Sequence, residues 1–128
     1  MGMYTEVFFR AEVDEDSYGI MSKIIEGVDP ATFSDVHPFF GMDRAWGVFQ
    51  CESYYHPGPF HRLFESEERF NLRMVSFRSS LKNYGGEIEA FFDWVAPHVL
   101  PSQARLFIGY QLYEEDEEPT LYYTADRT

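Results

Sequence analysis

The chain has 128 residues, of which 45% are hydrophobic, 25% are charged and 19% are aromatic. This length and composition fit a single folded domain over 1–128 and exclude a disordered chain. Acidic residues outnumber basic ones by 22 to 10, so the formal net charge is −12. Such a charge repels phosphate backbones and anionic lipids, which disfavours direct binding to long nucleic acids or to a membrane surface.

Cysteine content and chain start add further expectations. The single cysteine, Cys51, excludes an internal disulfide and a cysteine-rich zinc site, and it favours a cytoplasmic location. No segment approaches the ~18 apolar residues of a membrane span. We expect residues 1–2 to be a cloning remnant ahead of a natural start at Met3.

The first half of the chain predicts two strands separated by a helix and a loop. Apolar and polar residues alternate over 4–13, as in a half-buried strand. An acidic stretch then offers N-caps, and apolar residues recur at helical spacing, which predicts a helix over 15–26. Residues 28–43 contain two prolines and no clean period, so we expect a long loop that packs on the domain. The aromatic run 44–55 predicts the second strand.

The second half predicts three more strands and a second helix. In the strand expected over 69–81, the apolar positions change from even to odd numbers, which predicts a β-bulge near Met74. Turn residues precede a helix expected over 87–96, and a proline follows it. Two further strands, over 106–112 and 120–123, flank an acidic turn.

The order of these elements predicts the fold class. The first six match a ferredoxin-like βαββαβ unit, and the seventh adds a C-terminal strand. We therefore expect an α+β domain in which two helices cover one face of a mostly antiparallel sheet.

Several short segments carry a family resemblance. They are Leu81-Lys82-Asn83-Tyr84, Glu87-Ile88-Glu89, Phe92, Trp94, Gly109-Tyr110, Tyr113-Glu114-Glu115, Glu118-Pro119-Thr120-Leu121-Tyr122-Tyr123, Met3-Tyr4-Thr5-Glu6 and Ser53-Tyr54-Tyr55. Through them the chain resembles a group of small proteins of phages and phage-derived bacterial regions, to which no activity is assigned. The resemblance implies a cytoplasmic accessory protein and carries over no catalytic residue.

Five consecutive acids are the sharpest charge feature of the chain. They are Glu114, Glu115, Asp116, Glu117 and Glu118. Such a run forms either a solvated turn or a tip that docks on a basic protein, and Tyr54 and Tyr55 would add aromatic anchors. Together with the resemblance, the run favours a non-enzymatic protein that binds a basic partner, such as a host nucleic-acid enzyme or a defence component.

An arginine-bearing segment supports an alternative function. Arg69 and Arg73 fall on one face of the strand expected over 69–81, and the expected bulge would bring Arg78 to that face. Beside Tyr4 on the open sheet, these arginines would bind a nucleotide or another small anion. Pairing with acids of neighbouring strands is the other explanation of the arginines.

Patterns for catalysis and metal binding are not found in the sequence. His56 and His61 lack the spacing of zinc ligands, and neither a nucleophile elbow nor a phosphate-binding loop occurs. A cysteine such as Cys51, within an aromatic strand, is usually a small buried hydrophobe. We expect no enzymatic activity and no cofactor.

The aromatic excess leads to a third hypothesis, a homodimer or a larger structural homo-oligomer. Its contact surface would contain Trp46, Tyr54, Tyr55, Phe60, Tyr110, Tyr122 and Tyr123.

Overall fold

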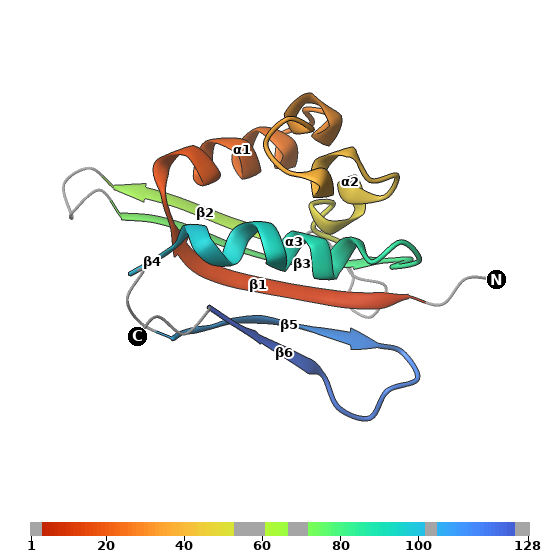
Figure 1. The fold of residues 1–128 in the computed structure, drawn as a ribbon. Helices are drawn as coiled ribbons and strands as arrows, with labels where there is room; N and C mark the ends of the chain where they lie inside the picture. Colours follow the sequence, from red (N-terminus) through yellow and green to blue (C-terminus); the bar gives the residue numbers. More distant parts are fainter. Residues whose placement is uncertain (1–3, 53–60, 67–71, 102–104, 125–128) are drawn as a thin grey trace.

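A computed structural model describes residues 4–52, 61–66, 72–101 and 105–124. The described residues form an α+β domain whose α-helices all lie on one face of an antiparallel sheet (Figure 1). The six strands are β1 (Thr5–Val13), β2 (His61–Ser66), β3 (Leu72–Leu81), β4 (Val99–Leu100), β5 (Phe107–Tyr113) and β6 (Thr120–Tyr123). The α-helices are α1 (Glu15–Ile25), α2 (Ala45–Val48) and α3 (Glu87–Val95), and three 3-10 helices are η1 (Pro30–Phe33), η2 (Pro38–Gly41) and η3 (Ala96–His98).

The strand order is β2-β3-β1-β5-β6, and β4 pairs with the end of β1. Strand β1 is central, because Phe9 lies opposite Phe77 of β3 on one side and Gly109 of β5 on the other. Phe9 is fully buried, and its ring centroid lies 5.2 Å from that of Phe91 in α3. Alternation along β1 therefore directs one set of side chains into a core of phenylalanines beneath the helices.

A glycine in β5 lets an aromatic pair close the core. The rings of Phe92 and Tyr122 stack with centroids 3.9 Å apart. A Cβ atom at Gly109 would lie 2.0 Å from the backbone oxygen of Phe8 and 3.0 Å from Cζ of Phe92. Only glycine fits between the neighbouring strand and the aromatic ring at this position.

Most predicted elements are confirmed by the structure. The strands expected over 4–13, 106–112 and 120–123 and the helices expected over 15–26 and 87–96 are present within a residue or two. The loop expected over 28–43 packs on the domain, with Phe39 and Phe40 fully buried, and it contains η1 and η2. Within the described ranges, no helix has both the length and the apolar character needed to cross a membrane.

The strand expected over 44–55 is wrong for its described part. Residues 45–48 form α2, and residues 53–55 lie outside the described residues. The buried residues Ala45, Val48 and Phe49 follow the i, i+3, i+4 spacing of a helix, which also suits an aromatic-rich strand at this short length. The second strand of the fold, β2, instead begins at residue 61.

The bulge expected near Met74 is also wrong. Pairing between β1 and β3 runs without interruption from Glu12–Met74 to Thr5–Leu81. Apolar residues change parity because Met74 lies on the sheet face opposite the helices, whereas Val75 and Phe77 lie in the core. The α+β class and the antiparallel sheet are confirmed. A ferredoxin-like topology is not established, because a helix replaces one expected strand and the strand set differs.

Candidate functional site

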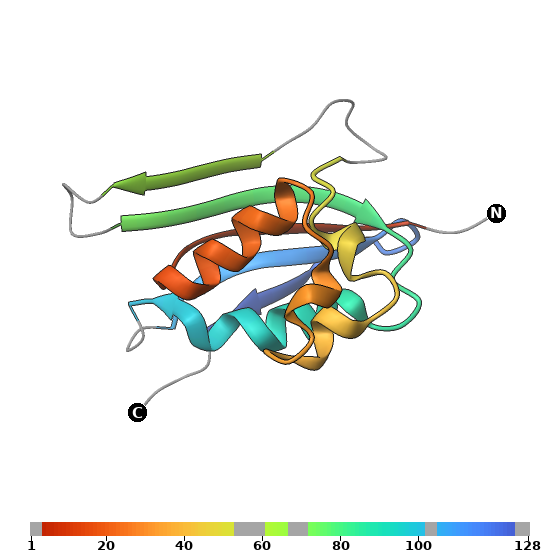
Figure 2. The same ribbon diagram turned by 90° about the horizontal axis from the view of Figure 1, so that it is seen from above.

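A hollow of about 330 Å³ lies at one end of the sheet. Three segments meet there: the residue before β1, the chain around α2, and the end of β3. Figures 1 and 2 show why they meet, since β1 begins beside the end of the antiparallel strand β3 and α2 lies above that end. Its lining includes Tyr4, Arg44, Trp46, Gln50 and Lys82.

Close packing of α2 on β3 positions one wall of the hollow. A Cβ atom at Gly47 would lie 2.9 Å from Cβ of Leu81, so only glycine allows this approach without a shift. Beyond α2, the side-chain amide of Gln50 donates a hydrogen bond to the backbone oxygen of Ser80. The backbone N–H of Ser80 donates to the oxygen of Glu52 at 2.8 Å, which fixes the chain after α2 along β3.

Two cations face the hollow, and each lies over an aromatic ring. The guanidinium carbon of Arg44 is 5.1 Å from the ring centroid of Tyr84, and Nζ of Lys82 is 5.9 Å from that of Tyr4. Both side chains are half-buried. Among the residues that the structure describes, neither cation forms an ion pair with a carboxylate. Two positive charges that form no ion pair with a described carboxylate thus lie together in a chain of net charge −12.

An exposed indole lines this hollow and a second one. Trp46 is 56% exposed and belongs to the lining of both the cationic hollow and a hollow of about 230 Å³. The second hollow contains two carboxylates, Asp29 and Asp43. An exposed indole that borders both cations and carboxylates offers a face on which a planar ring can stack.

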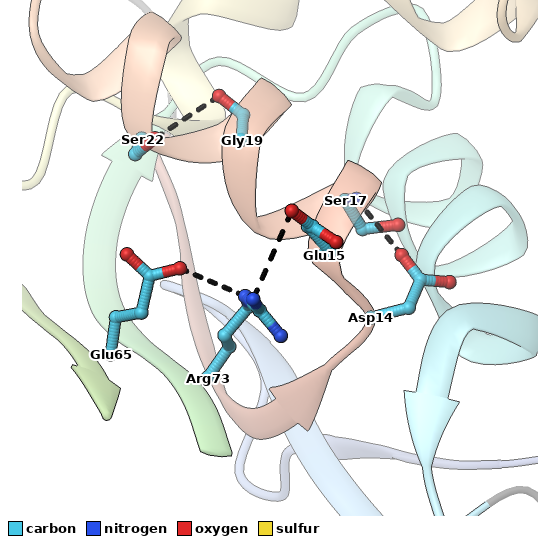
Figure 3. A network of polar contacts seen from close by, with 7 residues as sticks. All are labelled: Asp14, Glu15, Ser17, Gly19, Ser22, Glu65 and Arg73. Carbon is cyan, nitrogen blue, oxygen red and sulfur yellow. Dashed lines mark hydrogen bonds and ion pairs between the residues drawn. The ribbon is translucent and has the colours of Figure 1, made fainter. Parts of the chain in front are cut away.

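The structure does not bring Arg73 and Arg78 together on one face of the sheet. Arg73 and Arg78 lie five residues apart in an uninterrupted strand, so their side chains are on opposite faces of the sheet. Nε of Arg73 donates to Oε2 of Glu65 at 2.9 Å, and Nη2 lies 3.9 Å from Oε1 of Glu15 in α1 (Figure 3). Nε of Arg78 lies 3.8 Å from Oε1 of the buried Glu6. Arg69 lies outside the described residues.

The acidic run is exposed in the turn between β5 and β6. Its first member is fastened to the start of β1, because Oε1 of Glu114 accepts a hydrogen bond from the N–H of Tyr4 at 3.1 Å. The N–H of Glu114 in turn donates to the oxygen of Tyr4 at 3.2 Å. Glu114 therefore lies next to Tyr4, which lines the cationic hollow. Tyr54 and Tyr55 lie outside the described residues.

The aromatic residues weighed for self-association are distributed over several surfaces. Tyr122 stacks on the core residue Phe92, whereas Tyr110 stacks on Phe8 at 5.5 Å. The hydroxyl of Tyr110 donates to Oε2 of Glu6 at 2.9 Å, and burial together with this bond raises the pKa of Tyr110 to about 12. A homodimer stays a prediction, and Phe60 lies outside the described residues.

The cysteine is held in a closed environment. Cys51 is 3% exposed, has a left-handed φ of 62°, and donates its backbone N–H to Oγ of Ser79 at 2.9 Å. Burial, with a smaller contribution from the charge of Glu52, raises the pKa of its thiol to about 12. The thiol is therefore protonated at neutral pH and is a poor nucleophile.

Two other titratable residues, Asp14 and His37, cap the N-termini of helices. Oδ1 of Asp14 caps α1 by accepting from the N–H of Ser17 at 2.9 Å, and its Oδ2 lies 2.8 Å from Nδ1 of His98. His37 caps η2 in the same way and contacts Asp93 at 3.1 Å. In the described part of the chain, no group of three or more His, Cys, Asp or Glu residues is placed to hold a metal ion.

Sequence reasoning missed Arg44, Trp46 and Lys82 as site residues. Reading residues 44–55 as a strand hid the fact that Trp46 is on the outer side of a helical turn whose inner side is buried. A signal for Lys82 and Tyr84 was present, because both belong to the Leu81–Tyr84 segment of the family resemblance. Only Tyr4 was both predicted as a ligand-binding residue and found in the hollow.

Comparisons with known proteins give no relative: no protein-family model matches the chain, and no curated protein and no solved structure matches it.

Proposed function

We propose that the protein is a non-enzymatic binding domain that holds a small anionic ligand in the hollow between α2 and the end of β3. One observation carries the proposal: Arg44 and Lys82 face the same hollow, and neither has a carboxylate partner among the described residues. By contrast, Arg73 and Arg78 of β3 each lie within 4.0 Å of a carboxylate.

The chemistry of the lining supports anion binding. A guanidinium presents a planar fork that matches phosphate or carboxylate oxygens, and an ammonium adds a second charge-assisted hydrogen bond. The ring of Tyr84, 5.1 Å from the guanidinium carbon of Arg44, stabilises this cation beside the hollow. Because charges beyond ~8 Å are screened at physiological ionic strength, the net charge opposes long polyanions more than one small anion.

Thermal unfolding with added anions tests the proposal. Ligand at 100 times its dissociation constant stabilises the fold by about 2.7 kcal/mol. We expect phosphate, pyrophosphate or ribose 5-phosphate to raise Tm, and Lys82→Ala to abolish the rise. The other lysine of the chain, Lys23, is exposed and lies outside the hollow, so Lys23→Ala is the matched control. No rise with any anion, or an equal rise in Lys82→Ala, would contradict the proposal.

The acidic run favours a second candidate function, docking on a basic protein. All five side chains at 114–118 are exposed, and none is ion-paired with a basic residue in the described ranges. The phage resemblance supports a host nucleic-acid enzyme or defence component as the partner. Charge reversal in a Glu115→Lys, Glu117→Lys variant should slow association and reduce its dependence on salt, whereas an unchanged association rate would exclude this tip.

A further inference from the structure

We infer that the ligand of the cationic hollow is a nucleoside monophosphate whose base stacks on Trp46. The inference rests on the proposed function, because the phosphate occupies the hollow between Arg44 and Lys82. Beyond the anion site, the inference states that the ligand has a planar ring and that the edge of this ring carries hydrogen-bond donors.

The position of Trp46 supports a planar ring in the ligand. This indole is 56% exposed, although the neighbouring aromatic residues Phe40 and Phe49 are buried in the core. It belongs to α2, which close contact of Gly47 with Leu81 holds against β3. An exposed indole beside two cations is an arrangement in which a base stacks while its phosphate is neutralised.

The second hollow favours hydrogen-bond donors on the edge of the ligand's ring. A ring lying on Trp46 extends from the cationic hollow toward the hollow that contains Asp29 and Asp43. Oδ1 of Asp29 already accepts from the N–H of Ala31 at 3.0 Å, whereas Asp43 is exposed and forms no ion pair among the described residues. A carboxylate accepts hydrogen bonds only, so it favours a base that presents amino and ring N–H donors. Guanine presents two such donors on one edge.

The size of the site fits this ligand class. The two hollows measure about 330 Å³ and about 230 Å³ and share Trp46 as a wall. Small-molecule sites begin at roughly 300 Å³. A phosphate alone would leave the acidic hollow and the exposed indole without a role.

Tryptophan fluorescence tests the inference in the full chain. Trp46 is exposed, whereas Trp94, the other tryptophan, is 3% exposed, so a stacked base should quench the first and leave the second emitting. We expect GMP to quench the emission and to bind about tenfold more tightly than ribose 5-phosphate, which carries the phosphate without the base.

Variants assign the gain in affinity to the ring. Trp46→Ala removes the fluorescent reporter and ribose 5-phosphate has no base to quench it, so these affinities are measured by isothermal titration calorimetry. Trp46→Ala should reduce GMP affinity to that of ribose 5-phosphate, and Asp43→Asn should weaken GMP binding severalfold without affecting ribose 5-phosphate. Phe64, an exposed aromatic residue of β2 outside both hollows, supplies the control Phe64→Ala, which should behave as the wild type.

The outcomes separate the two proposals. If ribose 5-phosphate binds in a manner that depends on Lys82 and GMP binds no more tightly, the anion site stands and the nucleotide inference fails. If GMP gains affinity but Trp46→Ala retains the gain, the inference also fails. If neither compound binds, the nucleotide inference fails, and the anion site fails with it unless phosphate or pyrophosphate raises Tm in a manner that depends on Lys82.

Discussion

Two glycine substitutions should change stability in opposite directions. At Gly47, an added Cβ would lie 2.9 Å from Cβ and 3.3 Å from Cδ1 of Leu81, shorter than the ordinary carbon contact of ~3.5–4.0 Å. Leu81 is 3% exposed, and its backbone is paired with Thr5, so it cannot readily move away. Overpacking of this kind costs about 1–3 kcal/mol, and improved helix propensity returns at most ~1 kcal/mol.

Gly19 provides the matched control within a helix of the same domain. A Cβ atom there would meet nothing within 4 Å, so Gly19→Ala should stabilise the fold by about 0.5–1 kcal/mol. Urea unfolding of both variants measures the difference. Gly47→Ala should lower the free energy of unfolding by about 1–2 kcal/mol and, by shifting α2 with Arg44 and Trp46, weaken anion binding.

The reasoning would be refuted by a Gly47→Ala protein as stable as the wild type, or by two variants that change stability in the same direction. A destabilised Gly47→Ala protein with unchanged anion binding would leave the packing argument intact. It would, however, show that anion binding in the hollow does not depend on the position of α2.

Three further predictions concern other parts of the fold. Burial opposes ionisation of Asp14, but hydrogen bonds from Ser17 and His98 outweigh it and hold the pKa of Asp14 below 3.8. The ionised cap therefore stabilises the fold above about pH 3.8, and this stabilisation is lost as the pH falls through the lowered pKa. Asp14→Ala should lower the free energy of unfolding by about 1 kcal/mol at pH 7 and by less at pH 3, as measured by urea unfolding. With its thiol pKa raised to about 12, Cys51 should not react with a thiol reagent at pH 8 unless urea is added, and rapid native labelling would contradict its burial. Gly109→Ala should prevent stable folding, because its Cβ would overlap the oxygen of Phe8 at 2.0 Å; a circular dichroism melt like that of the wild type would show that β1 and β5 are less close.

Sequence patterns predict best those elements in which the spacing of apolar residues agrees with the side chains that the fold buries. Alternation over β1 follows the two faces of a central strand, and the side chain of Asp14 caps the start of α1 as the acidic stretch predicts. The helical structure of residues 45–48 differs from the expected strand because Ala45, Trp46, Val48 and Phe49 satisfy a helical and an extended pattern equally. Their choice of α2 depends on the approach of Gly47 to Leu81, a contact between segments that sequence patterns do not reveal.

The sequence predicts the ligand class of the candidate site, a small anion, but, apart from Tyr4, not the residues that form the site. The sequence predicts a small-anion site with Tyr4, but it assigns to that site the arginines of the strand expected over 69–81. Uninterrupted pairing directs Arg73 toward Glu15 and Glu65 and places Arg78 on the other face. The observed hollow joins residues 4, 44–50 and 80–82, and only the folded topology brings these segments together.

Amide and indole chemical-shift mapping during a titration with GMP tests the central claim most directly. The account predicts shifts at the backbone N–H groups of 44–50 and 82–84 and at the indole N–H of Trp46. It predicts none at the indole N–H of Trp94, which is buried. A titration that shifts only the amides around Arg73 and Arg78, or that shifts nothing at millimolar GMP, would contradict it.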